Sequence, residues 1–214
     1  MSDLSIKSYK KADFVEKNKK FKFALTDRDL ILKIKEIIKK YNYEDLRPVF
    51  VCVGSDLVVG DCLGPLVGTM LKNIKGSPYV YGSLNMPVTA KEVNSVGKYI
   101  LKTHKKSFII AIDAGVGIRS DVGKIVVSGS GLKPGLGVNK KLEDVGDLSI
   151  VGVVAEKTPN NTKLFNYTRL NLIYNMATAI TEGLSAYLTY YKDKCRGISI
   201  FSHDIDKNKI KLAF

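Results

Sequence analysis

The stretch Val49-Phe-Val-Cys-Val-Gly-Ser-Asp-Leu-Val-Val-Gly-Asp-Cys-Leu-Gly-Pro65 decides the fold of this chain. It begins with a continuous apolar run, 49–53, which predicts a buried strand. The run ends at Gly54, and the glycine-punctuated segment that follows predicts a loop. Pro65 suits the start of a helix, because its φ is fixed and it has no N–H to leave unpaired. The order strand, loop, helix places an acidic residue, Asp61, in the loop just before the helix.

The segments around this stretch extend the alternation of helix and strand. Their order predicts an α/β fold, a three-layer sandwich in which helices cover both faces of a mostly parallel central sheet. The predicted helices span 30–43, 65–74 and 89–103, and the predicted strands span 49–53, 79–81 and 108–113.

The second half of the chain follows a different pattern. Residues 122–127 and 148–154 are predicted strands, separated by a long glycine-containing loop over 129–141. Apolar residues then recur at helical spacing over 162–191, which predicts one long helix packed on the sheet. We expect the tail to add a last strand, near its start (Gly197–Phe201) or at its end (Ile210–Leu212).

No internal repeat or low-complexity linker divides the chain, so we predict a single α/β domain over 1–214. Its core would span 26–191, with 1–25 and 192–214 as extensions. The first of these extensions has no clear periodicity.

Composition and charge narrow the class of protein. The chain is 45% hydrophobic and 26% charged, which is typical of a globular protein. No apolar run approaches the roughly 20 residues that span a bilayer, and the lysine-rich start lacks the apolar centre of a secretory signal. We therefore expect a cytoplasmic chain without a membrane partner. The net charge of +13 could attract nucleic acid, but no aromatic residues interleave with a clustered basic patch, so a nucleic-acid partner is not expected.

Two aspartates follow predicted strands and could face one crevice. Asp61 comes after the first strand and Asp113 closes the third, and the carboxyl ends of parallel strands converge. Two close carboxylates can share a proton and activate a water for attack on an amide. Both could instead stay ionised and hold a divalent metal. An aspartate at a strand end can also simply cap a helix or form a turn.

Several polar residues could complete such a site. Asp56 could cap its turn or contribute a third oxygen, and Cys62 could act as a nucleophile only with a histidine base, which is absent nearby in the sequence. The glycine-rich loop Lys133–Lys141 could cradle a substrate backbone or form a structural crossover. The residues expected to bind substrate are Asp56, Asn85, Gly135, Asn139 and Lys140.

Four motifs carry a resemblance to a known family. They are Gly54–Pro65, Ile112-Asp-Ala114, Lys133–Lys141 and Val145–Ile150. Together they resemble the sporulation protein YyaC family, also called spore protease YyaC. That family is similar in turn to the germination protease of spore formers and, more distantly, to hydrogenase maturation proteases.

The resemblance implies a phosphorylase/hydrolase-like fold, peptide-bond hydrolysis and an active site lined by Asp61 and Asp113. Hydrogenase maturation proteases use a histidine as a third metal ligand, but this chain has only His104 and His203, at a predicted helix end and in the tail. We therefore expect an acid pair without a metal or other cofactor, acting in the cytoplasm of the spore or forespore.

The resulting prediction is an aspartic-type endopeptidase that acts on a protein or peptide. The alternative is a non-catalytic module that binds peptides or regulates sporulation or germination on the same scaffold. Tyrosines recur along the final predicted helix, where they could face the core or a second copy of the chain. Whether the chain forms a homo-oligomer therefore stays an open question.

Overall fold

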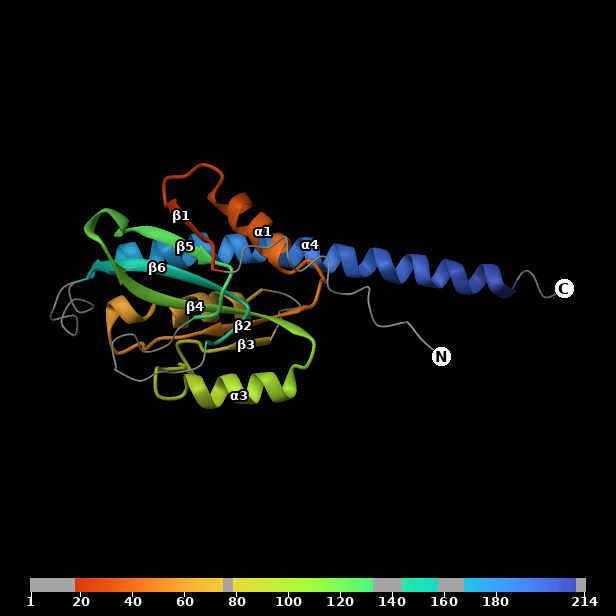
Figure 1. Cartoon of the computed structure of the whole chain (residues 1–214), viewed down its shortest axis with the longest axis horizontal. Helices are drawn as coiled ribbons and strands as arrows, with labels where there is room; N and C mark the ends of the chain where they lie inside the picture. The colour runs from red at the N-terminus through yellow and green to blue at the C-terminus, as the bar shows by residue number, and fades with distance from the viewer. Residues whose placement is uncertain (1–17, 75–78, 133–143, 158–167, 211–214) are drawn as a thin grey trace, which may run out of the picture.

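A six-stranded sheet forms the middle of the structure (Figure 1). This computed structural model describes residues 18–74, 79–132, 144–157 and 168–210, and of 198–210 only the backbone. The strand order is β1-β5-β6-β4-β2-β3, in which β6, β4, β2 and β3 run parallel to one another. Strand β5 pairs antiparallel with β6, and β1 pairs antiparallel with β5. The strands are β1 (Lys20–Ala24), β2 (Arg47–Cys52), β3 (Tyr79–Tyr81), β4 (Ser107–Gly117), β5 (Lys124–Ser128) and β6 (Leu148–Glu156).

Helices cover both faces of this sheet, which confirms the predicted three-layer α/β sandwich. Helices α1, α2 and α4 pack into one apolar cluster on one face, and α3 packs into a second cluster on the other. Figure 1 shows α1 and α3 on opposite sides of the sheet. The helices are α1 (Leu30–Tyr41), α2 (Leu63–Lys72), α3 (Val93–Thr103) and α4 (Leu170–Ile210), with single 3-10 turns η2 (Val59–Asp61) and η3 (Arg119–Asp121).

The alternation of side chains along β2 explains why both faces are buried. Phe50 and Cys52 point into the cluster under α2 and α4, whereas Val49, Val51 and Val53 point into the cluster under α3. All five are at most 4% exposed. A strand buried on both faces is a continuous apolar run, as the sequence has it here.

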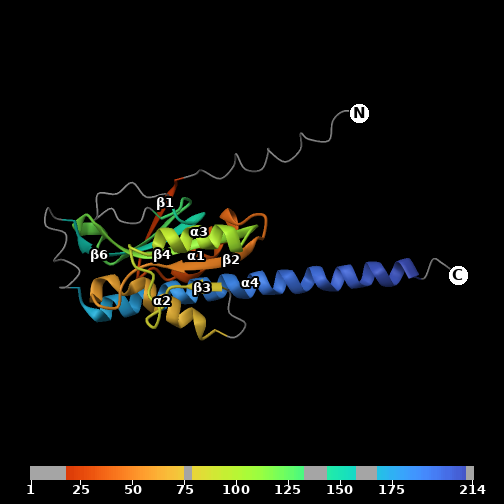
Figure 2. The same cartoon turned by 90° about the horizontal axis from the view of Figure 1, so that it is seen from below.

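Helix α4 is much longer than predicted. It has 41 residues, which at the usual helical rise is about 60 Å. Its first half packs on α1 and α2 through residues such as Ile180 and Leu184, and its last turns extend beyond the rest of the fold in both views (Figures 1 and 2).

The expected tail strand at 197–201 is wrong, because α4 continues through these residues. No proline interrupts the helix there, and Gly197 alone does not end it. Of the alternative strand at 210–212, Ile210 also lies in α4, and the other two residues lie outside the described part of the chain. No helix in the described ranges is long and apolar enough to cross a membrane.

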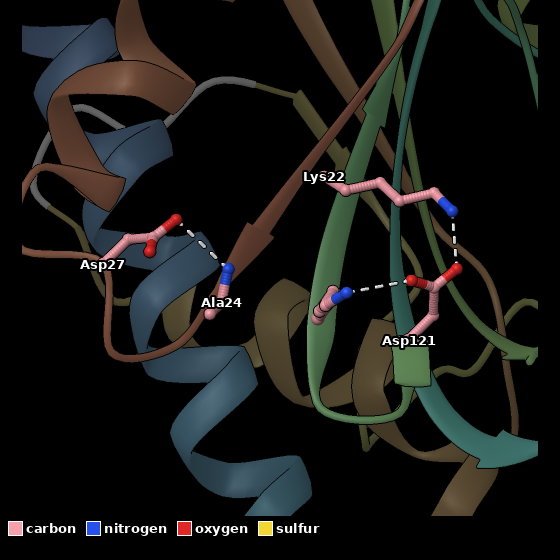
Figure 3. A network of polar contacts seen from close by, with 5 residues as sticks. Lys22, Ala24, Asp27 and Asp121 are labelled. Atoms are coloured by element: carbon pink, nitrogen blue, oxygen red, sulfur yellow. Dashed lines mark hydrogen bonds and ion pairs between the residues drawn. The ribbon is translucent and has the colours of Figure 1, made fainter. Parts of the chain in front are cut away.

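Strand β1 was not predicted from the sequence. It pairs antiparallel with β5, and a network of polar contacts holds it there (Figure 3). The Asp121 carboxylate accepts hydrogen bonds from the Lys22 amine at 2.5 Å and the Lys124 amine at 3.1 Å. At the end of β1, the Ala24 N–H donates to the Asp27 carboxylate at 3.2 Å. The two lysines lower the pKa of Asp121.

Glycines let α2 approach the carboxyl ends of the strands. A Cβ atom on Gly68 would lie 2.0 Å from the carbonyl oxygen of Gly82, which is too close for any side chain. Gly82 itself has a φ of +93°, and a Cβ there would lie 1.9 Å from the carbonyl oxygen of Cys52. The helix, the loop after β3 and the end of β2 are therefore in direct backbone contact.

We expect Gly68→Ala to lower the free energy of unfolding by about 2 kcal/mol, because the new methyl group forces α2 away from the strands. The matched control is Gly197→Ala, also in a helix, where nothing lies within 4 Å of the position that the new methyl group would take. This change should raise stability by up to about 1 kcal/mol through helix propensity. Urea denaturation followed by circular dichroism measures both. Equal effects of the two substitutions would contradict the close packing of α2.

Candidate functional site

Two aspartates lie near one another beside the carboxyl end of β2. Asp113 lies inside β4, which continues to Gly117, so the prediction that it closes its strand is wrong. Strands β2 and β4 are parallel neighbours whose register pairs Cys52 with Ile112, the residue before Asp113. The Val53 N–H donates a hydrogen bond to the Ile112 carbonyl at 2.7 Å. The loop that carries Asp61 therefore leaves β2 beside the point where β4 presents Asp113.

Gly54 turns this loop back toward the sheet. Its φ of +140° is rarely adopted by residues with a side chain, and a Cβ there would lie 2.1 Å from the Asp61 carbonyl oxygen. The Gly54 N–H donates to the Val88 carbonyl at 3.0 Å, and the Ser55 N–H donates to the Asp61 carbonyl at 3.2 Å. These contacts fix the backbone of Asp61 against the first residue of the loop.

The electrostatics indicate that the two carboxylates interact. Burial raises the pKa of Asp113 well above its usual range, and the charge of Asp61 raises it further. The Ala114 N–H, which donates to the Asp113 carboxylate at 2.8 Å, offsets part of this rise. Burial also raises the pKa of Asp61, with a smaller opposing effect from the Ser55 N–H. The structure thus brings together the two residues that the sequence singled out.

The other predicted residues are less central. Asp56 is exposed in the turn after β2, and Asn85 is exposed in the loop after β3. That loop is attached to α2, because the Leu84 N–H donates to the Thr69 hydroxyl at 2.9 Å and the Lys72 amine donates to the Ser83 hydroxyl at 3.1 Å. Gly135, Asn139 and Lys140 lie outside the described residues.

Cys62 is not placed as a nucleophile. Its thiol donates to the Val59 carbonyl at 3.0 Å, and burial together with the charge of Asp61 raises its pKa. A raised pKa keeps the thiol protonated and unreactive. His104, one of the two histidines that could serve as the base, follows α3 and pairs with the hydroxyl of Tyr81 at 2.6 Å.

The donors for a three-ligand metal site do not come together in the described ranges. No group of three or more histidine, cysteine, aspartate or glutamate side chains gathers there in a way that could hold an ion. Asp61 and Asp113 could supply two carboxylates, but no third donor joins them among these residues.

Two large apolar side chains near this edge were missed by the sequence analysis. Leu57, in the loop after β2, is 87% exposed, and Met86, in the loop after β3, is 73% exposed. Both loops follow the carboxyl ends of parallel strands, at the same end of the sheet as the Asp61 loop. Exposed apolar side chains at the rim of a site are candidates for contact with a ligand. Both loops also hold other apolar residues, such as Val59 and Leu84, so the sequence alone does not distinguish these two.

Comparison with known proteins places the chain in a family. Residues 22–183 match the family described as "Protein of unknown function (DUF1256)". The chain belongs to this family. It is 44% identical over 138 residues to the "Uncharacterized protein YyaC" of Bacillus subtilis (strain 168), covering 64% of this chain and 67% of that protein. The resemblance to the YyaC family is thus confirmed.

A solved structure also overlaps part of the chain. It is a [NiFe] hydrogenase maturation protease, HycI, from Thermococcus kodakarensis KOD1. The two share 17% identity and a TM-score of 0.42, over 65% of this chain and 93% of that one.

The raised pKa of Asp113 predicts a specific dependence of stability on pH. The folded protein binds this proton more tightly than the unfolded chain, so the free energy of unfolding falls as pH rises from the ordinary carboxyl pKa, about 4, to the raised one. Asp113→Asn removes the buried charge and should be more stable than the natural protein at neutral pH. The gain should disappear below about pH 4. Urea denaturation across this pH range measures it.

Asp193→Asn, at an exposed position on α4, is the control and should show no such gain. In a second measurement, Asp61→Asn should lower the pKa of Asp113, because a neighbouring negative charge is removed. Carboxyl-carbon NMR titration reads this pKa directly. An Asp113 pKa unchanged by Asp61→Asn would contradict the interaction between the two carboxylates.

Proposed function

We propose that this chain is a peptidase whose Asp61 and Asp113 carboxylates activate a water molecule. The observation that carries the proposal is the placement of the two residues: the loop of Asp61 leaves β2 beside Asp113 on the neighbouring strand β4. The charge of Asp61, which raises the pKa of Asp113, agrees with this placement. Two carboxyl groups that approach closely enough can share one proton, which makes one member an acid and the other a base. The resemblance of the loop motifs to the YyaC family and the germination protease supports the same reaction.

The environments of the two residues suggest their roles. The pKa of Asp113 is raised by both burial and a like charge, so it is the better candidate to keep the shared proton. Asp61 precedes α2 by two residues and interacts with the Ser55 N–H, and both a helix N-terminus and an N–H donor favour an ionised carboxylate. Asp61 is therefore the proposed base and Asp113 the proposed acid.

The reaction balances without a further reactant. Ionised Asp61 takes a proton from a water molecule while the oxygen of that water attacks the carbonyl carbon of the scissile amide. Protonated Asp113 donates a hydrogen bond to the carbonyl oxygen, on which negative charge develops. The C–N bond then breaks as the leaving nitrogen receives a proton from the pair. One water is consumed, and a carboxyl and an amine are formed.

The rim of the site suggests what part of a substrate it contacts. Leu57 and Met86 are large, apolar and exposed on loops at the same edge of the sheet. We propose that they contact apolar side chains of a protein or peptide substrate. The family resemblance further suggests action in the forespore, which a fluorescent fusion expressed from the native promoter in sporulating cells would locate.

We expect Asp61→Asn and Asp113→Asn each to lower the rate of peptide cleavage at least about a hundredfold, because general acid–base catalysis contributes that much or more. The substrates are acid-soluble proteins extracted from bacterial spores and a proteome-derived peptide library. Mass spectrometry of the fragments gives both the rate and the cleaved bond. The rate of the natural protein should fall at high pH, as Asp113 loses its proton.

Asp193→Asn, an exposed change on α4, is the matched control and should retain full activity. Circular dichroism must show that all three variants are folded. Retained cleavage by either site variant would refute the acid-pair mechanism. An absence of cleavage by the natural protein on both substrate sets, together with binding of the same peptides, would instead favour the non-catalytic peptide-binding module.

A further inference from the structure

A hollow lies at the opposite end of the sheet from the aspartates. It forms where β2, β3 and β4 begin and α3 ends, at Arg47, Tyr79, Ser107 and Thr103. Its volume is about 540 Å³. Pockets for small organic ligands in proteins have volumes of about 300–1,000 Å³. The hollow is therefore large enough for a ligand of several rings or groups, not just for a single small ion.

The charge of this hollow is entirely positive. Arg47 at the start of β2 and Lys105 and Lys106 in the turn before β4 line it, and no aspartate or glutamate of the described residues does. Within the described ranges, none of these three side chains forms an ion pair with a carboxylate, although other lysines of the chain do. Cations without a carboxylate partner, grouped around a hollow, attract an anionic ligand such as a phosphate group.

Aromatic rings line the same hollow. Tyr79 and Tyr99 are 49% and 55% exposed, so part of each ring is accessible to a ligand. The Arg47 guanidinium lies over the Tyr79 ring, 5.9 Å from its centroid, which places a cation and a ring side by side in the hollow. Both rings have aromatic neighbours: the Tyr79 ring lies 4.4 Å from the His104 ring between centroids, and the Tyr99 ring lies 6.1 Å from the Tyr81 ring. The Tyr81 hydroxyl in turn pairs with His104 at 2.6 Å. A planar heterocycle can stack on such rings, which favours a base over an aliphatic group.

The backbone at the turn supports a functional role. Lys106 has a φ of +60°, a left-handed conformation that favours glycine and is uncommon for lysine. Holding a residue with a side chain in this conformation costs free energy, and such positions cluster at binding sites. The lysine at this position contributes one of the three cations.

We propose that this hollow binds a nucleotide, with the base against the exposed tyrosines and the phosphates against Arg47, Lys105 and Lys106. The combination of rings and cations distinguishes this ligand from a free phosphate, which has no ring, and from a nucleoside, which has no charge. The site is independent of the acid pair and of the proposed peptidase function.

Isothermal titration calorimetry with the full chain tests the proposal. The ligands are ATP, AMP, adenosine and tripolyphosphate, each at low and at high salt. We expect ATP to bind most tightly, and adenosine and tripolyphosphate each at least about tenfold more weakly, because each lacks one of the two kinds of contact. Affinity for ATP should fall with added salt.

Substitutions of exposed residues locate the binding. Lys105→Gln with Lys106→Gln should weaken ATP binding about tenfold or more, since hydrogen bonds to charged groups are lost. The matched control, Lys91→Gln with Lys157→Gln, removes the same charge at exposed positions outside the hollow and should leave the Kd unchanged.

A second pair of variants tests the aromatic contact. Tyr99→Ala should weaken ATP binding about tenfold through lost stacking, while leaving tripolyphosphate binding unchanged. Its control is Tyr174→Ala, an equally exposed tyrosine on α4 at 54%, outside the hollow.

Three outcomes would overturn the proposal. Tripolyphosphate as tight as ATP would mean a polyanion site without base recognition. A single-stranded oligonucleotide that binds far more tightly than ATP would mean a nucleic-acid surface. Absence of ATP binding, or equal losses in the lysine variants and their control, would mean that the hollow holds no nucleotide.

Discussion

The carbonyl oxygen of Asp61 packs directly against the Cα of Gly54, and the arrangement of the candidate site depends on this contact. A Cβ at Gly54 would lie only 2.1 Å from that oxygen. The contact lets the loop after β2 fold back onto its own start, so that Asp61 comes near Asp113 rather than extending into solvent. Because β2 and β4 are hydrogen-bonded neighbours, the same contact brings the Asp61 carboxyl into electrostatic range of Asp113.

The close approach has a cost that the fold must offset. Both carboxyl pKa values are raised, chiefly because burial disfavours the charged forms. The extensive apolar clusters on the two faces of the sheet supply the stability that makes such a pair tolerable. Sites that bring like charges together are commonly less stable than they could be, and they are kept for their chemistry.

The sequence predicted the parts of the structure that depend on local pattern. The apolar run 49–53 marks β2, and the run that ends at Asp113 marks most of β4. Both strands are buried on both faces, so their sequences are continuous apolar runs that are easily recognised. The proximity of Asp61 and Asp113 followed from the rule that neighbouring parallel strands run in register, although β4 continues past Asp113 to Gly117 instead of ending there.

The missed features depend on contacts between distant segments. Strand β1 alternates lysine and phenylalanine and is a strand only because β5 lies beside it. The tail around Gly197 resembled a short strand, but the long α4 continues through it, and the continuity of a helix over many turns is not visible in a short window. The basic hollow was also missed. Arg47, Tyr79 and Lys106 belong to three separate segments, so no clustered patch is visible in the sequence.

The three cysteines differ in a way that has a practical consequence. Cys52 and Cys62 are buried, whereas Cys195 is exposed on α4, one turn beyond Tyr191 at the rim of the basic hollow. A thiol-reactive dye would therefore attach at one position of the natural, unsubstituted chain. The protein thus carries its own attachment point for a fluorescent reporter, next to one end of the sheet and remote from the buried thiol beside Asp61.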